Sequence, residues 1–240
     1  MQHIKTNLEV EINNLINKMP ENTDRYFSLL ATMAKFHKYS LSEQTSLHLY
    51  APVNASACAT AVQWEKFFGR HIKRDASGIK LLENAGLGTI RVVYDIKDTY
   101  TDNVKAAKPQ VWKYNEKGHG QLFNDLIDGD ASVSEKVIYL CRKIAEEKAK
   151  KLKSPSDEIA ASSAYVILKR LGYDPEIYLN NIIKKMNLTD PNMIWIILEH
   201  TNDIAKQILN PIGSYINGRR NSNGNTIFGN LVKYISDLVV

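Results

Sequence analysis

Apolar residues recur with the period of an α-helix through the first part of the chain. They predict four helices: one over residues 3–18, one that Asn22-Thr23-Asp24 begins, one that begins at Ser40, and one over residues 57–68. Pro20 and Pro52 end the first and third helices because proline cannot continue a helix. Gly69 ends the fourth. At the third start, Glu43 stands where a capping box places an acid.

The apolar pattern then changes to that of β-strands. Residues 78–83 and 89–96 predict two strands, which residues 84–88 join as a hairpin because they contain two glycines. Residues 110–114 are a candidate third strand. The polar stretch 98–108 has no clear period and is expected to be a loop.

The second half of the chain has only helical patterns. One helix is expected from Ser132 or Ser134, and three more begin at Ser154-Pro155, Asp174-Pro175 and Asp190-Pro191, where a capping side chain precedes proline. Gly172 and Asn210-Pro211 are expected to end two of these helices. A loop over residues 217–225 precedes a last helix.

These patterns predict an α+β protein with two domains. Residues 1–115 form a helix-rich N-terminal module with a small antiparallel sheet, and residues 116–240 form an all-helical C-terminal domain. The 240 residues are sufficient for a substantial core.

Composition adds information about charge and compartment. The net charge is +5, and residues 1–115 hold 15 Lys and Arg against 11 Asp and Glu, so attraction for a polyanion is expected in the first half. Cys58 and Cys141 are expected to be buried free thiols. We expect a cytoplasmic protein, because neither a signal peptide nor a membrane-spanning apolar run is evident.

The common catalytic motifs are missing from the sequence. No two histidines are four residues apart, so the zinc peptidase pattern His-Glu-x-x-His is absent. Walker A, dinucleotide-binding and Gly-x-Ser-x-Gly patterns are absent as well. We therefore expect no enzymatic activity, no catalytic residues, no metal and no cofactor, although a catalytic constellation need not be local in sequence.

Two segments combine aromatic and cationic residues, over 36–44 and over 64–81. A groove for single-stranded nucleic acid needs this composition, because cations follow the phosphates and aromatic faces stack on unpaired bases. Phe36, Phe67 and Phe68 are more typical of a core, and so is Trp64, whereas Tyr39 suits either role. From composition alone, this is a candidate nucleic-acid surface.

The order of these residues resembles the N-terminal domain of ArdC-type antirestriction proteins, which also occurs in primase-like and LtrC-like proteins of mobile elements. The similarity covers about residues 25–100 and includes the helix start at Phe36, the Gly78-Ile79-Lys80 segment and Val93-Tyr94-Asp95-Ile96. It implies single-stranded DNA binding by Tyr39, Ser40, Gln44, Trp64, Lys66, Arg70, Lys73, Arg74 and Lys80. Two positions depart from the family, which has Asn and Gly where this chain has Glu43 and Asp75.

The second half resembles, more faintly, the peptidase-like domain that follows in these families. The family pattern Ala-Glu-Ser-x-Ala-Tyr has a zinc-binding Glu, and Ala161 stands at that position here. No His lies between His119 and His200. The resemblance therefore implies a degenerate, metal-free helical domain that serves as a scaffold or contacts partners.

The expected function is binding of single-stranded DNA in plasmid transfer, conjugation, phage biology or antirestriction. Other proteins of the same mobile element are further expected partners, and a membrane is not. The main alternative is a protein-interaction adaptor of a mobile element that does not bind DNA. RNA binding is a third possibility, and a hydrolase ranks last.

Overall fold

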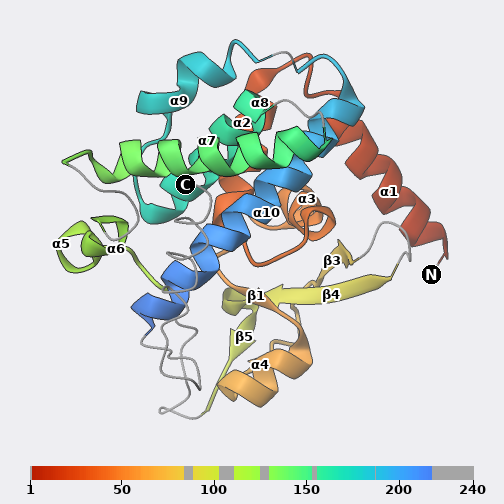
Figure 1. The fold of residues 1–240 in the computed structure, drawn as a ribbon. Helices are drawn as coiled ribbons and strands as arrows, with labels where there is room; N and C mark the ends of the chain where they lie inside the picture. The colour runs from red at the N-terminus through yellow and green to blue at the C-terminus, as the bar shows by residue number, and fades with distance from the viewer. Residues whose placement is uncertain are drawn as a thin grey trace. The chain divides into compact units, whose positions relative to one another are not determined.

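A computed structural model describes residues 2–83, 89–102, 111–124, 130–152, 156–186 and 188–217. The chain divides into two compact units, which are described separately. Unit 1 comprises residues 1–15 and 39–111, and unit 2 comprises residues 16–38 and 112–240. The α+β class is confirmed (Figure 1). We expected one division of the chain after residue 115. In the structure, residues 16–38 instead belong to the same unit as the C-terminal helices.

Unit 1 contains three of the expected helices. They are α1 (Gln2–Asn17), whose last residues belong to unit 2, α3 (Leu41–Tyr50) and α4 (Ala61–Phe68). The predicted capping box of α3 is confirmed, since the Ser40 hydroxyl accepts from the Glu43 amide and the Glu43 carboxylate accepts from the Ser40 amide. The predicted start of α4 at residue 57 is wrong. Thr60 caps α4 with a second capping box to Gln63, and residues 58–59 form a strand instead.

Five short strands form two antiparallel sheets in unit 1. The first sheet has the order β1 (Cys58–Ala59), β4 (Ile90–Asp95) and β3 (Ile79–Leu82), and the second pairs β2 (His71–Ile72) with β5 (Thr99–Tyr100). The predicted antiparallel pairing of β3 and β4 is confirmed, with Ile79 opposite Val93 and Leu82 opposite Ile90. The hairpin loop 84–88 lies outside the described residues.

Two predictions for the chain after β4 are wrong. In the expected loop over residues 98–108, Asp98 ends η1 (Ile96–Asp98) and residues 99–100 form β5, because they pair with β2, which lies far back in the sequence. Residues 103–108 lie outside the described part. In the expected strand over residues 110–114, residue 110 is outside the described part, and residues 111–115 form no strand. The Trp112 carbonyl accepts from the Arg170 side chain instead of a strand partner.

The core of unit 1 lies between α3 and one face of the three-stranded sheet. Leu81 and Val93 project from this face and are buried, as is Leu47 of α3. On the same face, Arg91 forms an ion pair with Glu43. Figure 1 shows α3 above β3 and β4, with α4 beside β5.

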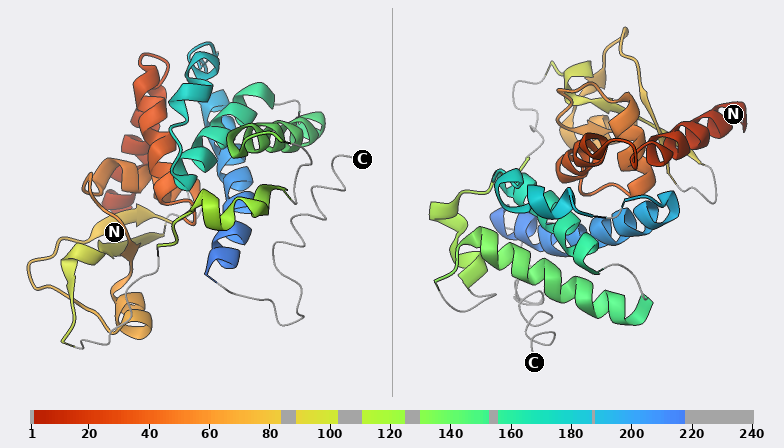
Figure 2. Two further views of the ribbon diagram at one scale, coloured as in Figure 1. Left: turned by 90° about the vertical axis from the view of Figure 1, so that its left-hand side faces the viewer. Right: turned by 90° about the horizontal axis from the view of Figure 1, so that it is seen from above.

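Unit 2 is helical in its described part. Its elements are α2 (Thr23–Lys35), α5 (Glu116–His119), α6 (Gln121–Asn124), α7 (Val133–Leu152), α8 (Ser156–Leu171), α9 (Glu176–Ile183) and α10 (Pro191–Ile216). The buried α8 is the centre of this unit, with α2, α7 and α10 packed around it (Figure 2). Its small residues allow close approach, and the Tyr26 hydroxyl of α2 is hydrogen-bonded to the Ser162 hydroxyl at 2.8 Å.

The caps of unit 2 follow the expected signals, with two exceptions. At Asp174-Pro175 the N-cap of α9 is Pro175, one residue later than expected, and no side chain caps it, although the Asp174 carboxylate accepts from the Glu176 amide. Asp190 caps α10 and Pro191 is its first residue, and Gly172 follows α8 with a positive φ of 92°. The expected end at Asn210-Pro211 is wrong, because α10 continues through Pro211 to Ile216. Proline inside a helix costs about 3 kcal/mol, which burial of Ile212 and close packing of Gly213 on Trp112 offset. The Ser154-Pro155 signal and the last predicted helix lie outside the described residues.

The two cysteines form no disulfide. Cys58 and Cys141 are free, and Cys141 is buried as expected, whereas Cys58 is only partly buried. None of the helices in the described ranges has the length and apolarity needed to cross a membrane.

Candidate nucleic-acid interface

The candidate interface of unit 1 begins where α4 turns into β2. Gly69 adopts φ 57°, a left-handed conformation that glycine accepts at little cost, and its amide satisfies the carbonyls of Trp64 and Glu65 at the helix end. The chain then reverses directly into β2, which pairs with β5. We call α4 residues 66–68, the β2–β5 pair and the turn 73–75 the ribbon face.

Three ring side chains are exposed on the ribbon face. His71 and Tyr100 lie directly opposite each other across β2 and β5, with ring centroids 5.7 Å apart, and Tyr100 is 45% exposed. Phe67, in the last turn of α4, is 61% exposed. Expecting Phe67 in the core was therefore wrong. Exposed rings held on secondary structure are the form of platform on which unpaired bases stack.

Four cations lie close in sequence to Phe67 and His71. Lys66, Lys73 and Arg74 are exposed, and Arg70 is partly buried. The Lys66 ammonium lies 5.8 Å from the centroid of the Phe67 ring.

Two cations of the ribbon face, Arg70 and Lys73, have neutral hydrogen-bond partners. Arg70 donates from Nε to the Thr99 hydroxyl at 2.6 Å and from Nη2 to the Thr99 carbonyl at 3.2 Å. Lys73 donates from Nζ to the Lys97 carbonyl at 2.6 Å. These acceptors are neutral, and within the described ranges no carboxylate forms an ion pair with either cation. A guanidinium has five N–H donors, so Arg70 retains donors for a phosphate.

Three of the expected site residues lie in the interior or serve the fold. Trp64 is 1% exposed, and its indole N–H donates to the Tyr94 carbonyl at 2.9 Å. Gln44 is fully buried, and Ser40 caps α3. The structure places none of the three where it could meet a base, so we assign them to the framework that holds the ribbon face.

Tyr39 also has a structural position. Its hydroxyl donates to the Cys58 carbonyl at 2.5 Å, and the Arg91 guanidinium lies 5.8 Å from its ring centroid. Burial raises the pKa of this phenol above its ordinary value. Tyr39 therefore joins the start of α3 to β1 and β4.

The two departures from the family pattern have different surroundings. Glu43 is 6% exposed and is occupied by the capping box and by Arg91. Its carboxylate is thus neutralised inside unit 1. Asp75 is exposed beside Arg74 in the turn, so it is the acid that belongs to the ribbon face.

The structure divides the expected site into separate groups. Lys66, Arg70, Lys73 and Arg74 gather at the ribbon face, whereas Lys80 projects from β3 of the other sheet, opposite Val92. Lys80 also lines a pocket of about 530 Å³.

Sequence reasoning missed His71 and Tyr100. His71 lies inside the basic segment, and a ring among cations is a usable signal. Tyr100 has no comparable signal. It meets His71 through the pairing of two strands of two residues each, whose partners are 27 and 29 residues apart, and strands this short have no recognisable sequence pattern.

The described residues contain no group of three His, Cys, Asp or Glu side chains that could hold a metal ion. Ala161, at the position of the family's zinc-binding Glu, is a buried residue of α8.

Comparison with known proteins gives no significant match to a family model, to a curated protein or to a solved structure. The chemistry of the ribbon face is therefore the main indication of function.

Proposed function

We propose that unit 1 binds single-stranded DNA through the ribbon face, without catalysis and without a cofactor. The observation that carries this proposal is the gathering of exposed rings at Phe67, His71 and Tyr100 among cations that no described carboxylate neutralises. The rings supply stacking, worth about 1–3 kcal/mol per base, and the cations attract the phosphates.

The resemblance to the ArdC-type N-terminal domain supports the same ligand. It motivates a biological setting in mobile elements, such as plasmid transfer or antirestriction. The residues that would contact bases differ from those that the resemblance implies, since Trp64 and Gln44 are buried.

The test is fluorescence anisotropy with matched single- and double-stranded oligonucleotides at two salt concentrations. We expect tighter binding of the single strand, because duplex bases are not free to stack. The logarithm of affinity should fall with the logarithm of salt by about 0.7 per phosphate neutralised. Equal affinity for the duplex, or binding that salt does not weaken, contradicts the proposal.

Competition distinguishes the alternatives. A protein that reads the 2′-hydroxyl prefers RNA, so matched dT and rU oligomers separate DNA binding from RNA binding. An adaptor that contacts an acidic protein partner through the same cations shows no measurable affinity for either oligomer.

A further inference from the structure

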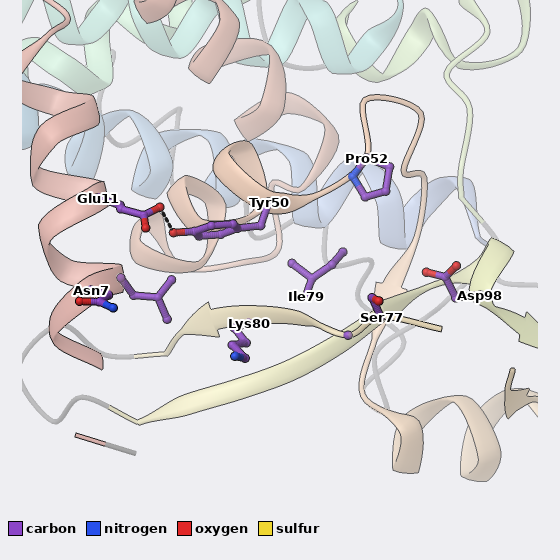
Figure 3. Close-up of a pocket in the computed structure, with 10 residues that line it drawn as sticks. Asn7, Glu11, Tyr50, Pro52, Ser77, Ile79, Lys80 and Asp98 are labelled. Carbon is purple, nitrogen blue, oxygen red and sulfur yellow. Dashed lines mark hydrogen bonds between the residues drawn. The ribbon is translucent and has the colours of Figure 1, made fainter. Parts of the chain in front are cut away.

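The pocket of unit 1 lies along the free edge of β3. It is about 530 Å³ in volume, within the range of small-molecule sites. Leu8 and Glu11 of α1, Tyr50 and Pro52 at the end of α3, and residues 77–80 line it, together with Asn7 and Asp98 (Figure 3).

The edge of β3 presents main-chain groups to this pocket. The Glu83 amide donates to the Thr89 carbonyl, which makes alternate residues of β3 bond to β4. Lys80 and Leu82 therefore direct their N–H and C=O groups away from β4. The Leu82 amide donates to the Ser46 hydroxyl at 3.1 Å. The main-chain N–H and C=O of Lys80 form no hydrogen bond with any other described residue.

A short open strand edge suits a compact ligand. An added peptide strand needs several successive residues, and Ser46 already occupies the Leu82 amide. A single N–H donor beside a single C=O acceptor matches the donor–acceptor edge that every nucleobase carries. The apolar side chains of Leu8, Ile79 and Pro52 and the ring of Tyr50 form walls for a flat heterocycle.

The charges of the pocket favour the base over the phosphate. Glu11 and Asp98 line it, and the only cationic side chain among its described lining residues is Lys80. Figure 3 shows Ile79 and Lys80 on opposite sides of β3, with Ile79 on the side of Tyr50. The Glu11 carboxylate accepts from the Tyr50 hydroxyl, and a carboxylate has about four acceptor sites, so it can accept from a ligand as well.

We propose that this pocket takes one neutral, amino-bearing nucleobase, adenine, cytosine or guanine, in preference to thymine. The base pairs with the main chain of Lys80 and donates its amino group to Glu11 or Asp98. Thymine lacks an amino donor, so it gains less from the two carboxylates.

The proposal rests on single-stranded DNA binding and adds base preference to it. Only residues 75 and 76 separate Arg74 of the ribbon face from Ser77 of the pocket. Three residues span at most about 11 Å. One strand of DNA that contacts Arg74 is therefore near enough to place a base in the pocket.

The experiment titrates the four deoxynucleosides into protein labelled with ¹⁵N-lysine and follows the Lys80 amide resonance. Deoxyadenosine, deoxycytidine and deoxyguanosine should shift it saturably, and thymidine should bind more weakly. Glu11→Gln retains an acceptor for Tyr50 but loses the charge, so the amino-bearing nucleosides should bind roughly 10-fold more weakly. Glu21→Gln, at an exposed position of unit 2, is the matched control and should bind as the original chain does.

A second variant, Ser77→Trp, fills the pocket from an exposed position and should abolish the Lys80 shift. Equal binding of all four nucleosides, no Lys80 shift, or an unchanged preference in Glu11→Gln overturns the proposal. If oligonucleotides bind through the ribbon face while nucleosides leave Lys80 unmoved, the pocket proposal alone fails. If nucleosides bind while no oligonucleotide does, the proposed function fails and the pocket remains a nucleoside site.

Discussion

The two units each contain a cluster in which an arginine, a histidine and a large aromatic ring meet, and the clusters differ in exposure. In unit 2, the Arg170 guanidinium lies 3.7 Å from the centroid of the Trp112 ring, and the His37 ring meets the same indole edge-on at 5.8 Å. His37 and Trp112 are each 4% exposed. In unit 1, His71 and Tyr100 stand on the surface beside Arg70.

This difference shows that residue type does not decide whether such a cluster is buried or exposed. The Trp112 cluster uses its polar groups internally, since Arg170 donates from Nη2 to the Trp112 carbonyl at 2.9 Å. The ring of Trp112 is also closed off by Gly213, where an added Cβ would lie 2.4 Å from the indole nitrogen. The ribbon face leaves its rings open to a ligand. Four changes test the contrast.

The largest effect is expected from Trp112→Ala. Removal of a buried tryptophan should lower the free energy of unfolding by about 3–5 kcal/mol, which urea denaturation measures. Phe67→Ala is the matched change of an exposed ring and should cost far less stability. Similar losses in both variants would mean that Phe67 is part of a core.

The next effect concerns the pH dependence of stability. Burial, followed by the Arg170 charge, lowers the pKa of His37 to about 3. Between about pH 6.5 and 3, His37 is therefore protonated in the unfolded chain and neutral in the folded chain. The free energy of unfolding is highest above about pH 6.5 and falls as the pH drops toward 3, by up to about 1.4 kcal/mol per pH unit.

His37→Phe should reduce this slope in urea titrations between pH 6 and 4. Burial also lowers the pKa of His48, so part of the slope should persist in the variant. A variant with the full slope would assign the acid sensitivity to other groups.

Tyr100→Ala should weaken single-stranded DNA binding about 5- to 150-fold, the equivalent of roughly 1–3 kcal/mol for one lost stacking contact. Tyr178→Ala is the control, because Tyr178 is 43% exposed on α9 of unit 2 and Tyr100 is 45% exposed. Anisotropy titrations of both variants measure the difference. Equal affinities in the two variants would remove Tyr100 from the interface.

The smallest effect is expected from Arg74→Ala. Loss of one phosphate contact should reduce the salt slope by about 0.7 and leave the melting temperature unchanged. Arg25→Ala, an exposed arginine of unit 2, should leave the slope intact. Arg70→Ala is a less clean test, because Arg70 also bonds Thr99 of β5.

Local signals predicted much of this fold. The Ser40–Glu43 box, the Asp190-Pro191 start and the β3–β4 pairing depend on residues close in sequence, and all three are present. The β2–β5 pair depends on a contact between distant residues, which no local pattern reveals. Pro211 was misjudged because tertiary packing outweighs its local cost.

The candidate site was harder to predict than the fold. The sequence shows the cations as a cluster, since Lys66, Arg70, Lys73 and Arg74 are close in the chain. It could not tell which rings face outward. Trp64 and Phe67 are three residues apart on α4, but only Trp64 is buried, where its indole N–H donates to the Tyr94 carbonyl.

The hydroxyl of Ser46 has a consequence for association between copies of the chain. An unpaired strand edge is a template on which a second molecule can extend the sheet. Ser46 accepts the Leu82 amide and so interrupts that template at Leu82. In the described part of the chain β3 is an edge strand of its sheet, and this small helical side chain reduces the number of main-chain groups at which a second copy could add a strand.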